Sequence, residues 1–252
     1  MPELRATLDV AAYLDRIGYT GSTAPTLPTL RALHRAHMLA APFENLDIAR
    51  RRRIALDESR LFDKIVVRRR GGFCYELNGL FAELLRTLGY RVEMLAARVA
   101  TAGIPFGHLA LRVLLDEPWL ADVGFGDSFT EPLRLVLDVQ QPQEGSVYRI
   151  VAEGDEWQVQ RQQKDGWARQ YQFALAAFQW ADFAGGCEYH QSSPDSIFTQ
   201  RRICSRATPG GRVTLSEMKL IISEGGQRSE RALASDAEYA AVLRDYFDIT
   251  LD

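Results

Sequence analysis

The sequence is short of cysteine and histidine, with three cysteines and four histidines in 252 residues. Cys74, Cys187 and Cys204 are too few and too scattered for a disulfide framework, which predicts reduced thiols and a cytoplasmic location. His34 and His37 lie one helical turn apart, but no second pair of ligands has a suitable spacing. We therefore expect these two histidines to pack or cap, and we expect no metal cofactor.

Long apolar runs and a basic excess are also missing. No stretch approaches the roughly 20 residues that span a bilayer, and the N-terminus lacks the pattern of a signal peptide. The formal net charge of -3 provides no global field to attract nucleic acid or membrane, and neither is expected as a partner. The arginine runs at 50–53 and 68–70 are interpreted as solvated loops, some of whose arginines could meet a phosphorylated ligand.

What the sequence does contain is ample core material, with 46% hydrophobic residues, in three stretches of different periodicity. Up to about residue 90 the apolar spacing is helical. One helix is expected to begin at Thr26 or Thr29 and to end before Pro42, and a second to run from Asp57 through Ile65. A third is expected at 74–88, with an apolar face formed by Leu77, Leu80, Phe81, Leu84, Leu85 and Leu88.

The rest of the chain is dominated by predicted strands. Short strands are expected near 92–94, 108–115, 119–123, 147–152, 157–160 and 167–173, which is typical of a small antiparallel barrel or sandwich. Further strands at 203–206, 212–215 and 219–222 precede a last helix, which the capping box of Ser235 and Glu238 should begin. The sequence thus predicts an α+β fold with regions 1–90, 91–186 and 187–252.

Cys74 opens the best of the predicted helices and follows Gly71 and Gly72. A helix N-terminus carries partial positive charge and free N–H groups, which favour a thiolate over a thiol and could stabilise an oxyanion. A small buried hydrophobe is the alternative, and position alone does not decide between them. Cys187 and Cys204 have no such setting and are interpreted as structural.

Two further residues could complete a catalytic set. His108 begins a predicted strand after a glycine-bearing loop, and Asp122 lies 14 residues later within an apolar strand. A carboxylate there needs a partner, and the offset suits neighbouring strands of one hairpin. Asp122 could then orient His108, the base for a nucleophilic Cys74. Asp127 is a rival acid, although its position after two glycines favours a solvated turn.

Four segments resemble motifs of the arylamine N-acetyltransferase family: PFENLD at 42–47, RGGFCYELN at 70–78, DVGFG at 122–126 and SPDSIFTQ at 193–200. They occur in the family's order along a chain of similar length to bacterial members. The resemblance implies a triad of Cys74, His108 and Asp122 in a papain-like core. It also implies an N-terminal helical bundle, a central antiparallel β-barrel and a C-terminal α/β lid.

The same resemblance implies acetyl-CoA as co-substrate, an arylamine or arylhydrazine as acceptor, and a role in xenobiotic metabolism by a monomer or weak homo-oligomer. The remaining matched positions are the pocket walls Phe73, Phe125 and Phe198, the coenzyme loop Ile104, Pro105, Phe106 and Gly107, and a buried ion pair of Glu44 with Arg70.

Three other functions remain open at this point. An amide synthase of natural-product biosynthesis would share these motifs but take its acyl chain from a carrier protein. A thiol hydrolase of the papain or transglutaminase type would use the same triad logic. A non-enzymatic binding protein could keep the fold without turnover. Acetylation of Cys74 by acetyl-CoA, and its removal by an arylamine, would separate the expected acetyltransferase from all three.

Overall fold

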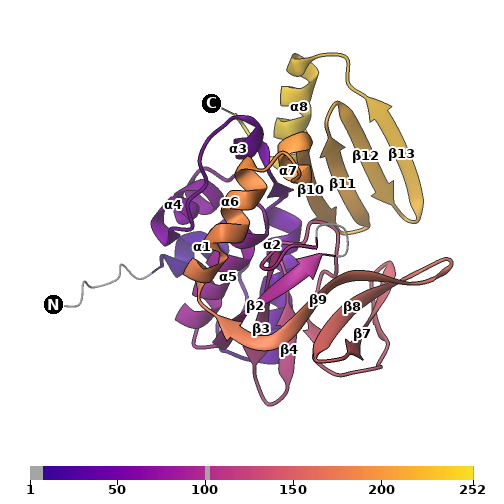
Figure 1. Cartoon of the computed structure of the whole chain (residues 1–252). Helices are drawn as coiled ribbons and strands as arrows, with labels where there is room; N and C mark the ends of the chain where they lie inside the picture. The colour runs from indigo at the N-terminus through magenta and orange to yellow at the C-terminus, as the bar shows by residue number, and fades with distance from the viewer. Residues whose placement is uncertain (1–7, 100–102, 252) are drawn as a thin grey trace.

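The N-terminal third is helical, and its helices surround the one that begins at Cys74 (Figure 1). The computed structural model describes residues 8–99 and 103–251. The main helices are α1 (Val10–Arg16), α2 (Leu27–Ala40) and α5 (Cys74–Thr87), with the short α3 (Leu46–Ala49) and α4 (Glu58–Phe62) between them. Thr26 caps α2 and Asp57 caps α4, as expected. The chain beyond α4 widens into a π-helical turn, η1 (Asp63–Val67), where a continuous α-helix was predicted.

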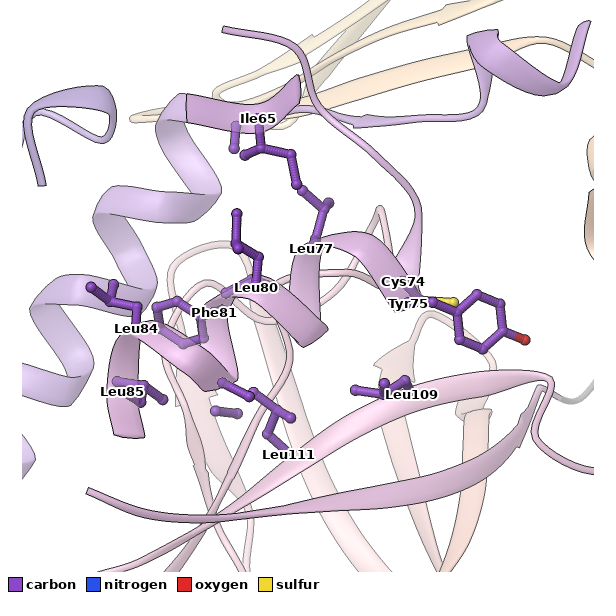
Figure 2. Packing of buried hydrophobic residues seen from close by; sticks show 14 of the residues in the cluster. Ile65, Cys74, Tyr75, Leu77, Leu80, Phe81, Leu84, Leu85, Leu109 and Leu111 are labelled. Carbon is purple, nitrogen blue, oxygen red and sulfur yellow. The ribbon is translucent and has the colours of Figure 1, made fainter. Parts of the chain in front are cut away.

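Helix α5 is the packing centre of the molecule. Five residues of its predicted apolar face, Leu77, Leu80, Phe81, Leu84 and Leu85, are fully buried, while the sixth, Leu88, caps the helix and is partly buried. Figure 2 shows these side chains between η1, which carries Ile65, and the barrel strand that carries Leu109 and Leu111. Burying side chains of this size contributes about 1.5–3 kcal/mol each. The start of α5 is thereby fixed against both the helical region and the barrel.

The middle region forms an eight-stranded antiparallel sheet, in the order β5-β4-β3-β2-β9-β8-β7-β6, that curls into a nearly closed barrel. Side-chain amides bridge its two edges: Gln141 of β6 accepts a hydrogen bond from the backbone N–H of Arg134 on β5 and donates one to its carbonyl oxygen. The strands are β2 (Arg91–Val99), β3 (His108–Leu114), β4 (Pro118–Ala121), β5 (Leu133–Arg134), β6 (Gln141–Gln143), β7 (Ser146–Glu153), β8 (Glu156–Gln163) and β9 (Gly166–Phe178).

The third region adds a second antiparallel sheet, which Figure 1 shows at the upper right, above the barrel strands β7 to β9. Two short helical elements, η2 (Trp180–Phe183) and α7 (Ile197–Gln200), flank α6 (Ala184–Ser192) and lead into this sheet. Its strands are β10 (Ile203–Thr208), β11 (Gly211–Ser216), β12 (Lys219–Glu224) and β13 (Gln227–Ala232). Helix α8 (Asp236–Phe247) packs against it, and Ser235 caps α8 by accepting from the Glu238 backbone N–H, as predicted.

The three regions are tied together by pairing across their boundaries. The short strand β1 (Phe43–Glu44) belongs to the first region yet pairs with β10 of the third. Helix α6 runs across residue 186, where the second region was expected to end. The divisions at 90 and 186 therefore stay a prediction about folding units. The α+β class with bundle, barrel and lid is confirmed.

Candidate active site

Cys74 is the first residue of α5, and glycines allow other segments to approach it closely. A Cβ atom on Gly71 would lie 1.9 Å from the Pro42 carbonyl oxygen, and one on Gly124 would lie 2.7 Å from the Cys74 Cα atom. A side chain at either position would push the neighbouring backbone away. The glycines on both sides of the helix start are therefore required by the packing. The exposed fraction of Cys74 is 3%, and it lines a pocket.

His108 and Asp122 meet as the hairpin register predicts. Strands β3 and β4 pair antiparallel, so the start of β3 faces the residues that follow β4. The His108 Nε2 atom lies 2.7 Å from the Asp122 Oδ2 atom, and both side chains are buried. Cys74 and His108 line the same pocket. The ring of Tyr171 packs against His108 at 5.0 Å between centroids, which shields the pair from water.

Asp122 is held in place by three groups besides His108. Its Oδ1 atom accepts from the Asn78 side-chain amide at 2.8 Å and from the Gly124 backbone N–H at 3.0 Å. Its own backbone N–H donates to the His34 Nε2 atom at 3.1 Å, while His34 Nδ1 lies 2.8 Å from the Thr130 carbonyl oxygen. That pair of contacts fixes the neutral tautomer of His34 with the proton on Nδ1. His34 thus positions the acid, a role that the sequence did not reveal.

The two charges of the pair stabilise each other. Burial alone would lower the pKa of His108, but the carboxylate of Asp122, its hydrogen bond to the ring and, to a lesser degree, the nearby Cys74 raise it to about 10. Burial acts to raise the pKa of Asp122, yet His108, Asn78 and the Gly124 N–H hold it below the usual value. His108 is therefore an imidazolium near neutral pH.

A second buried cluster lies beside the same helix start. The Arg70 guanidinium donates twice to the Glu44 Oε1 atom, at 2.7 and 3.0 Å, and once to Asp47 at 3.1 Å. Lys64 extends the cluster, since its Nζ atom lies 2.8 Å from both Asp47 Oδ2 and Glu76 Oε1. The other Glu76 oxygen accepts from the Phe73 backbone N–H at 3.0 Å. The ion pair implied by the resemblance is thus part of a network of five charged residues. Burial raises the pKa of Glu76 to about 7, although Lys64 opposes the shift.

The pocket above Cys74 has a volume of about 410 Å³ and walls from all three regions. Cys74, His108 and apolar side chains line it together with Arg212 and Arg228 of the second sheet, which also line the neighbouring cleft. Two of the predicted wall residues, Phe125 and Phe198, line this pocket. The third, Phe73, is fully buried and contacts Phe198 edge-to-face at 6.0 Å, so it stands behind the wall.

A neighbouring cleft of about 290 Å³ continues from this pocket between barrel and lid. Asp127 lies at the junction with an exposed side chain, as predicted, but it pairs with Arg161 of β8 at 3.2 Å and Arg212 of β11 at 3.1 Å. Arg212 and Arg228 line both hollows. The cationic side chains therefore gather where the two hollows join, and apolar side chains surround Cys74.

The four residues of the predicted coenzyme loop have different surroundings in the structure. Gly107 lines the pocket at Cys74, whereas Phe106 packs into the core against Phe178 and Phe183, and its carbonyl oxygen accepts from the Tyr75 hydroxyl at 2.6 Å. Ile104 and Pro105 are not among the residues that line the pocket.

His190 of α6 is a wall residue that sequence reasoning missed. Its Nε2 atom lies 3.2 Å from the Gly107 carbonyl oxygen, and its Nδ1 atom lies 2.9 Å from the Ser196 hydroxyl oxygen. Its ring contacts Phe198 at 5.0 Å between centroids. No local pattern marks this histidine as a wall residue, because Gly107 comes from a distant segment and the contact with Ser196 depends on the turn between them.

Cys187, Cys204 and His37, which are interpreted as structural from the sequence, are all buried. Burial raises the pKa of the thiols of Cys187 and Cys204. The His37 Nδ1 atom lies 3.0 Å from the Tyr13 hydroxyl oxygen. His37 shares no hydrogen-bond partner with His34 among the bonds found in the described residues. In the part of the chain that the structure describes, no group of three or more potential ligands could hold a metal ion. No helix of that part is long and apolar enough to cross a membrane.

Comparison with known proteins gives a consistent result. A family model described as N-acetyltransferase matches residues 26–252. The arylamine N-acetyltransferase of Escherichia coli is 38% identical over 248 residues, which cover 95% of this chain and 88% of the relative. Human arylamine N-acetyltransferase 1 is 32% identical over 275 residues, covering 97% and 95%.

Solved structures agree in fold as well as sequence. The arylamine N-acetyltransferase of Salmonella typhimurium has a TM-score of 0.92 and 35% identity, with 96% of this chain and 92% of that chain covered. The Mycobacterium marinum enzyme in complex with CoA has a TM-score of 0.90 and 36% identity, with 96% and 93% covered. The chain belongs to the arylamine N-acetyltransferase family.

Proposed function

We propose that this enzyme transfers an acetyl group from acetyl-CoA to an arylamine or arylhydrazine through an acetyl-Cys74 thioester. The observation that carries the proposal is the buried contact of His108 and Asp122, 2.7 Å apart, beside a cysteine at a helix start. The raised pKa of His108 supports an imidazolium that can supply a proton to the leaving group. The relatives' shared activity and the CoA complex of one of them support the choice of substrates.

The first half-reaction forms the thioester. The Cys74 thiolate attacks the carbonyl carbon of acetyl-CoA, and the bond from that carbon to the coenzyme sulfur breaks. The imidazolium of His108 gives its proton to the departing sulfur. The backbone N–H groups of Cys74 and Tyr75 have no partner within the helix, because they belong to its first turn, and they are our candidates for binding the oxyanion.

The second half-reaction regenerates the enzyme. The amine nitrogen attacks the thioester carbon, the neutral His108 accepts the amine proton, and the Cys74 thiolate leaves. Asp122 holds the imidazole throughout and stabilises its charged form. Apolar walls at Phe125 and Phe198 suit an aromatic acceptor and reduce the access of water, which would otherwise hydrolyse the thioester.

The arginines of the pocket wall favour an orientation for the donor. Phosphate groups bind guanidinium groups strongly, so we place the phosphates of CoA near Arg212 and Arg228, where the pocket joins the second cleft. The acetyl end then reaches Cys74. The loop at Ile104, Pro105, Phe106 and Gly107 stays a predicted coenzyme contact, and the monomeric or weakly associated state also stays a prediction.

The test is to incubate the protein with acetyl-CoA alone and to measure intact and peptide masses. One acetyl group on Cys74, removed when an arylamine is added, is expected. The Cys74→Ser variant should acquire none, and its acetyl transfer should fall by a factor on the order of 10³ or more.

Other outcomes would overturn the proposal. Acid release without an amine would indicate a hydrolase. Transfer from a carrier-bound chain but not from acetyl-CoA would indicate an amide synthase. Binding of CoA without acetylation of Cys74 would indicate a protein that has kept the fold and lost turnover. A panel of acyl-CoAs and amines with wild type and Cys74→Ser distinguishes all of them.

A further inference from the structure

A second polar pocket, of about 390 Å³, shares no lining residue with the pocket at Cys74. It lies between the loop at residues 52–55, helix α4 and the π-turn η1. The acyl-transfer mechanism uses none of the side chains at its mouth. The arginine run at 50–53, which the sequence predicts to be a solvated loop, supplies part of its wall.

The floor of this pocket is the buried charge network. Asp47, Lys64 and Glu76 all line it, and Lys64 is almost fully buried with its Nζ atom 2.8 Å from each of the two carboxylates. The pocket therefore connects solvent to charged groups that are otherwise enclosed. A ligand here would lie close to Glu76, which binds the backbone N–H that directly precedes Cys74.

The charged side chains that line this pocket carry a net positive charge. Five cationic side chains face three carboxylates, an excess of two positive charges when all are ionised, in a chain whose net charge is -3. The cations are Arg52, Arg53, Arg60, Lys64 and Arg68, and the carboxylates are Asp47, Asp63 and Glu76. Arg68 is already paired with Asp63 at 2.7 Å. Lys64 is paired with the two carboxylates of the floor, Asp47 and Glu76. Arg52 also has an interaction partner, so the cations left for a ligand are the other two arginines of the rim.

Arg53 and Arg60 are the available cations. Both side chains are exposed, and none of the ion pairs or hydrogen bonds found among residues 8–99 and 103–251 involves either guanidinium. Two guanidinium groups beside a concave, hydrogen-bonding wall match a compact ligand with several anionic oxygens. A singly charged anion would leave part of the excess unbalanced, and a long polymer would not enter a hollow of this size.

We propose that this pocket binds a small anion that carries two or more phosphate groups, with Arg53 and Arg60 as its principal contacts. The site is separate from the proposed coenzyme position at Arg212 and Arg228, and it does not depend on the acyl-transfer mechanism. Ser59, on the same wall, adds a hydroxyl donor. The ligand class follows from the charge excess, the two free guanidinium groups and the size of the hollow.

The test is calorimetric titration with inorganic pyrophosphate at fixed ionic strength. We expect saturable one-to-one binding to the wild type, weakened about tenfold or more in the Arg53→Gln/Arg60→Gln variant, since each lost charge-assisted hydrogen bond costs on the order of one decade in Kd. The matched control is Arg91→Gln/Arg244→Gln, which removes the same charge from exposed sites elsewhere. This control should bind within about twofold of the wild type.

Three results would overturn the proposal. Absence of saturable binding to the wild type would remove the site. Equal weakening in both double variants would show a general charge effect. Binding that survives the loss of Arg53 and Arg60 but disappears with excess CoA would place pyrophosphate in the coenzyme pocket.

A second measurement on the wild type guards against misfolded variants. Phenylglyoxal modifies exposed arginines, and peptide masses show which ones react. Pyrophosphate should slow the modification of Arg53 and Arg60 by the occupied fraction while leaving Arg91 and Arg244 unchanged. Protection that is equal at all four positions, or absent from all four, would contradict the site.

Discussion

Two buried charged clusters meet at the start of α5, and they differ in how their charges are balanced. In the first, one imidazole faces one carboxylate, and the other oxygen of Asp122 is satisfied by Asn78 and Gly124. In the second, three carboxylates share two cations, Lys64 and Arg70. The first cluster opens onto the pocket at Cys74, while the second supports the backbone just before it.

The difference in balance has a consequence for proton binding. The one-to-one pair shifts both pKa values so that the charged forms persist. In the mechanism that we propose, acylation of Cys74 changes the neighbouring charge and allows His108 to release its proton. In the second cluster, burial and, to a lesser degree, the Glu44 carboxylate raise the pKa of Glu76 to about 7 against the opposing effect of Lys64. We infer that the first cluster moves protons and that the second maintains geometry.

The largest expected effect is on activity, at the one-to-one pair. Asp122→Asn keeps the shape but presents an amide to His108, so the imidazole loses both its charge partner and its fixed tautomer. Acetyl transfer should fall by a factor on the order of 10³–10⁴. Asp116→Asn, on the exposed turn of the same hairpin, is the control and should retain its rate. Steady-state kinetics with acetyl-CoA and an arylamine provide the measurement, and a loss below tenfold at Asp122 would contradict the assigned role.

The next effect is on stability, at the unbalanced network. Arg70→Met leaves Glu44 buried without its bidentate partner, which should lower the free energy of unfolding by about 3–5 kcal/mol. The neighbouring Arg69 pairs with Asp248 at the surface, and Arg69→Met should change it by about 0.5 kcal/mol or less. Urea unfolding of both variants measures the contrast. Equal losses at the two positions would show that the network does not stabilise the fold.

The raised pKa of His108 predicts a loss of stability in alkali. A histidine whose pKa is about 10 in the folded state and near 6.5 when unfolded binds its proton more tightly in the native protein. Its contribution is complete below pH 6.5 and disappears as the pH rises through about 10. Unfolding free energies of Cys74→Ser and of Cys74→Ser/His108→Gln should therefore converge between pH 6.5 and 10. Parallel curves would contradict the pair.

Much of the site could be predicted because its signals are local in sequence. The period of α5, the glycines before it and the hairpin that joins His108 to Asp122 each lie within a short segment. His34 and His190 were missed as site residues because their partners, Asp122 and Gly107, come from distant elements. The residues that neighbour each histidine in the sequence do not indicate such a contact.

Part of the fold could not be predicted either, because the contacts that form it join segments far apart in the sequence. Strand β1 has two residues and exists only because β10, from the far end of the sequence, pairs with it. Arg16 was not singled out, yet its buried guanidinium donates to the carbonyl oxygens of Ile65, Ala40, Arg69 and Arg70. The arginine run at 68–70 divides between surface and core, since Arg70 is 2% exposed. Only packing of the whole chain determines which arginine is buried.

The smallest expected effect tests whether the pocket wall is part of the catalytic cluster. His190 joins Gly107, next to His108, to Ser196, which accepts a hydrogen bond from the backbone N–H of Phe198. His190→Leu removes both hydrogen bonds, so the loop before the base and the apolar wall lose a shared support. We expect the KM for the arylamine to rise about threefold to tenfold. Acetylation of Cys74 by acetyl-CoA should change by about twofold or less, because the triad contacts remain.

The split between the two half-reactions is what distinguishes a positioning role from a structural one. A general loss of packing would slow acetylation and acceptor transfer together. Ser196→Ala would then slow both half-reactions in the same way as His190→Leu. His190→Asn keeps a donor and an acceptor on a shorter side chain and should recover part of the acceptor KM. If His190→Leu and His190→Asn slow both half-reactions equally, His190 only packs the fold. If the acceptor KM alone responds, His190 positions the wall that holds the acceptor, and the cluster that moves protons is limited to its one-to-one pair.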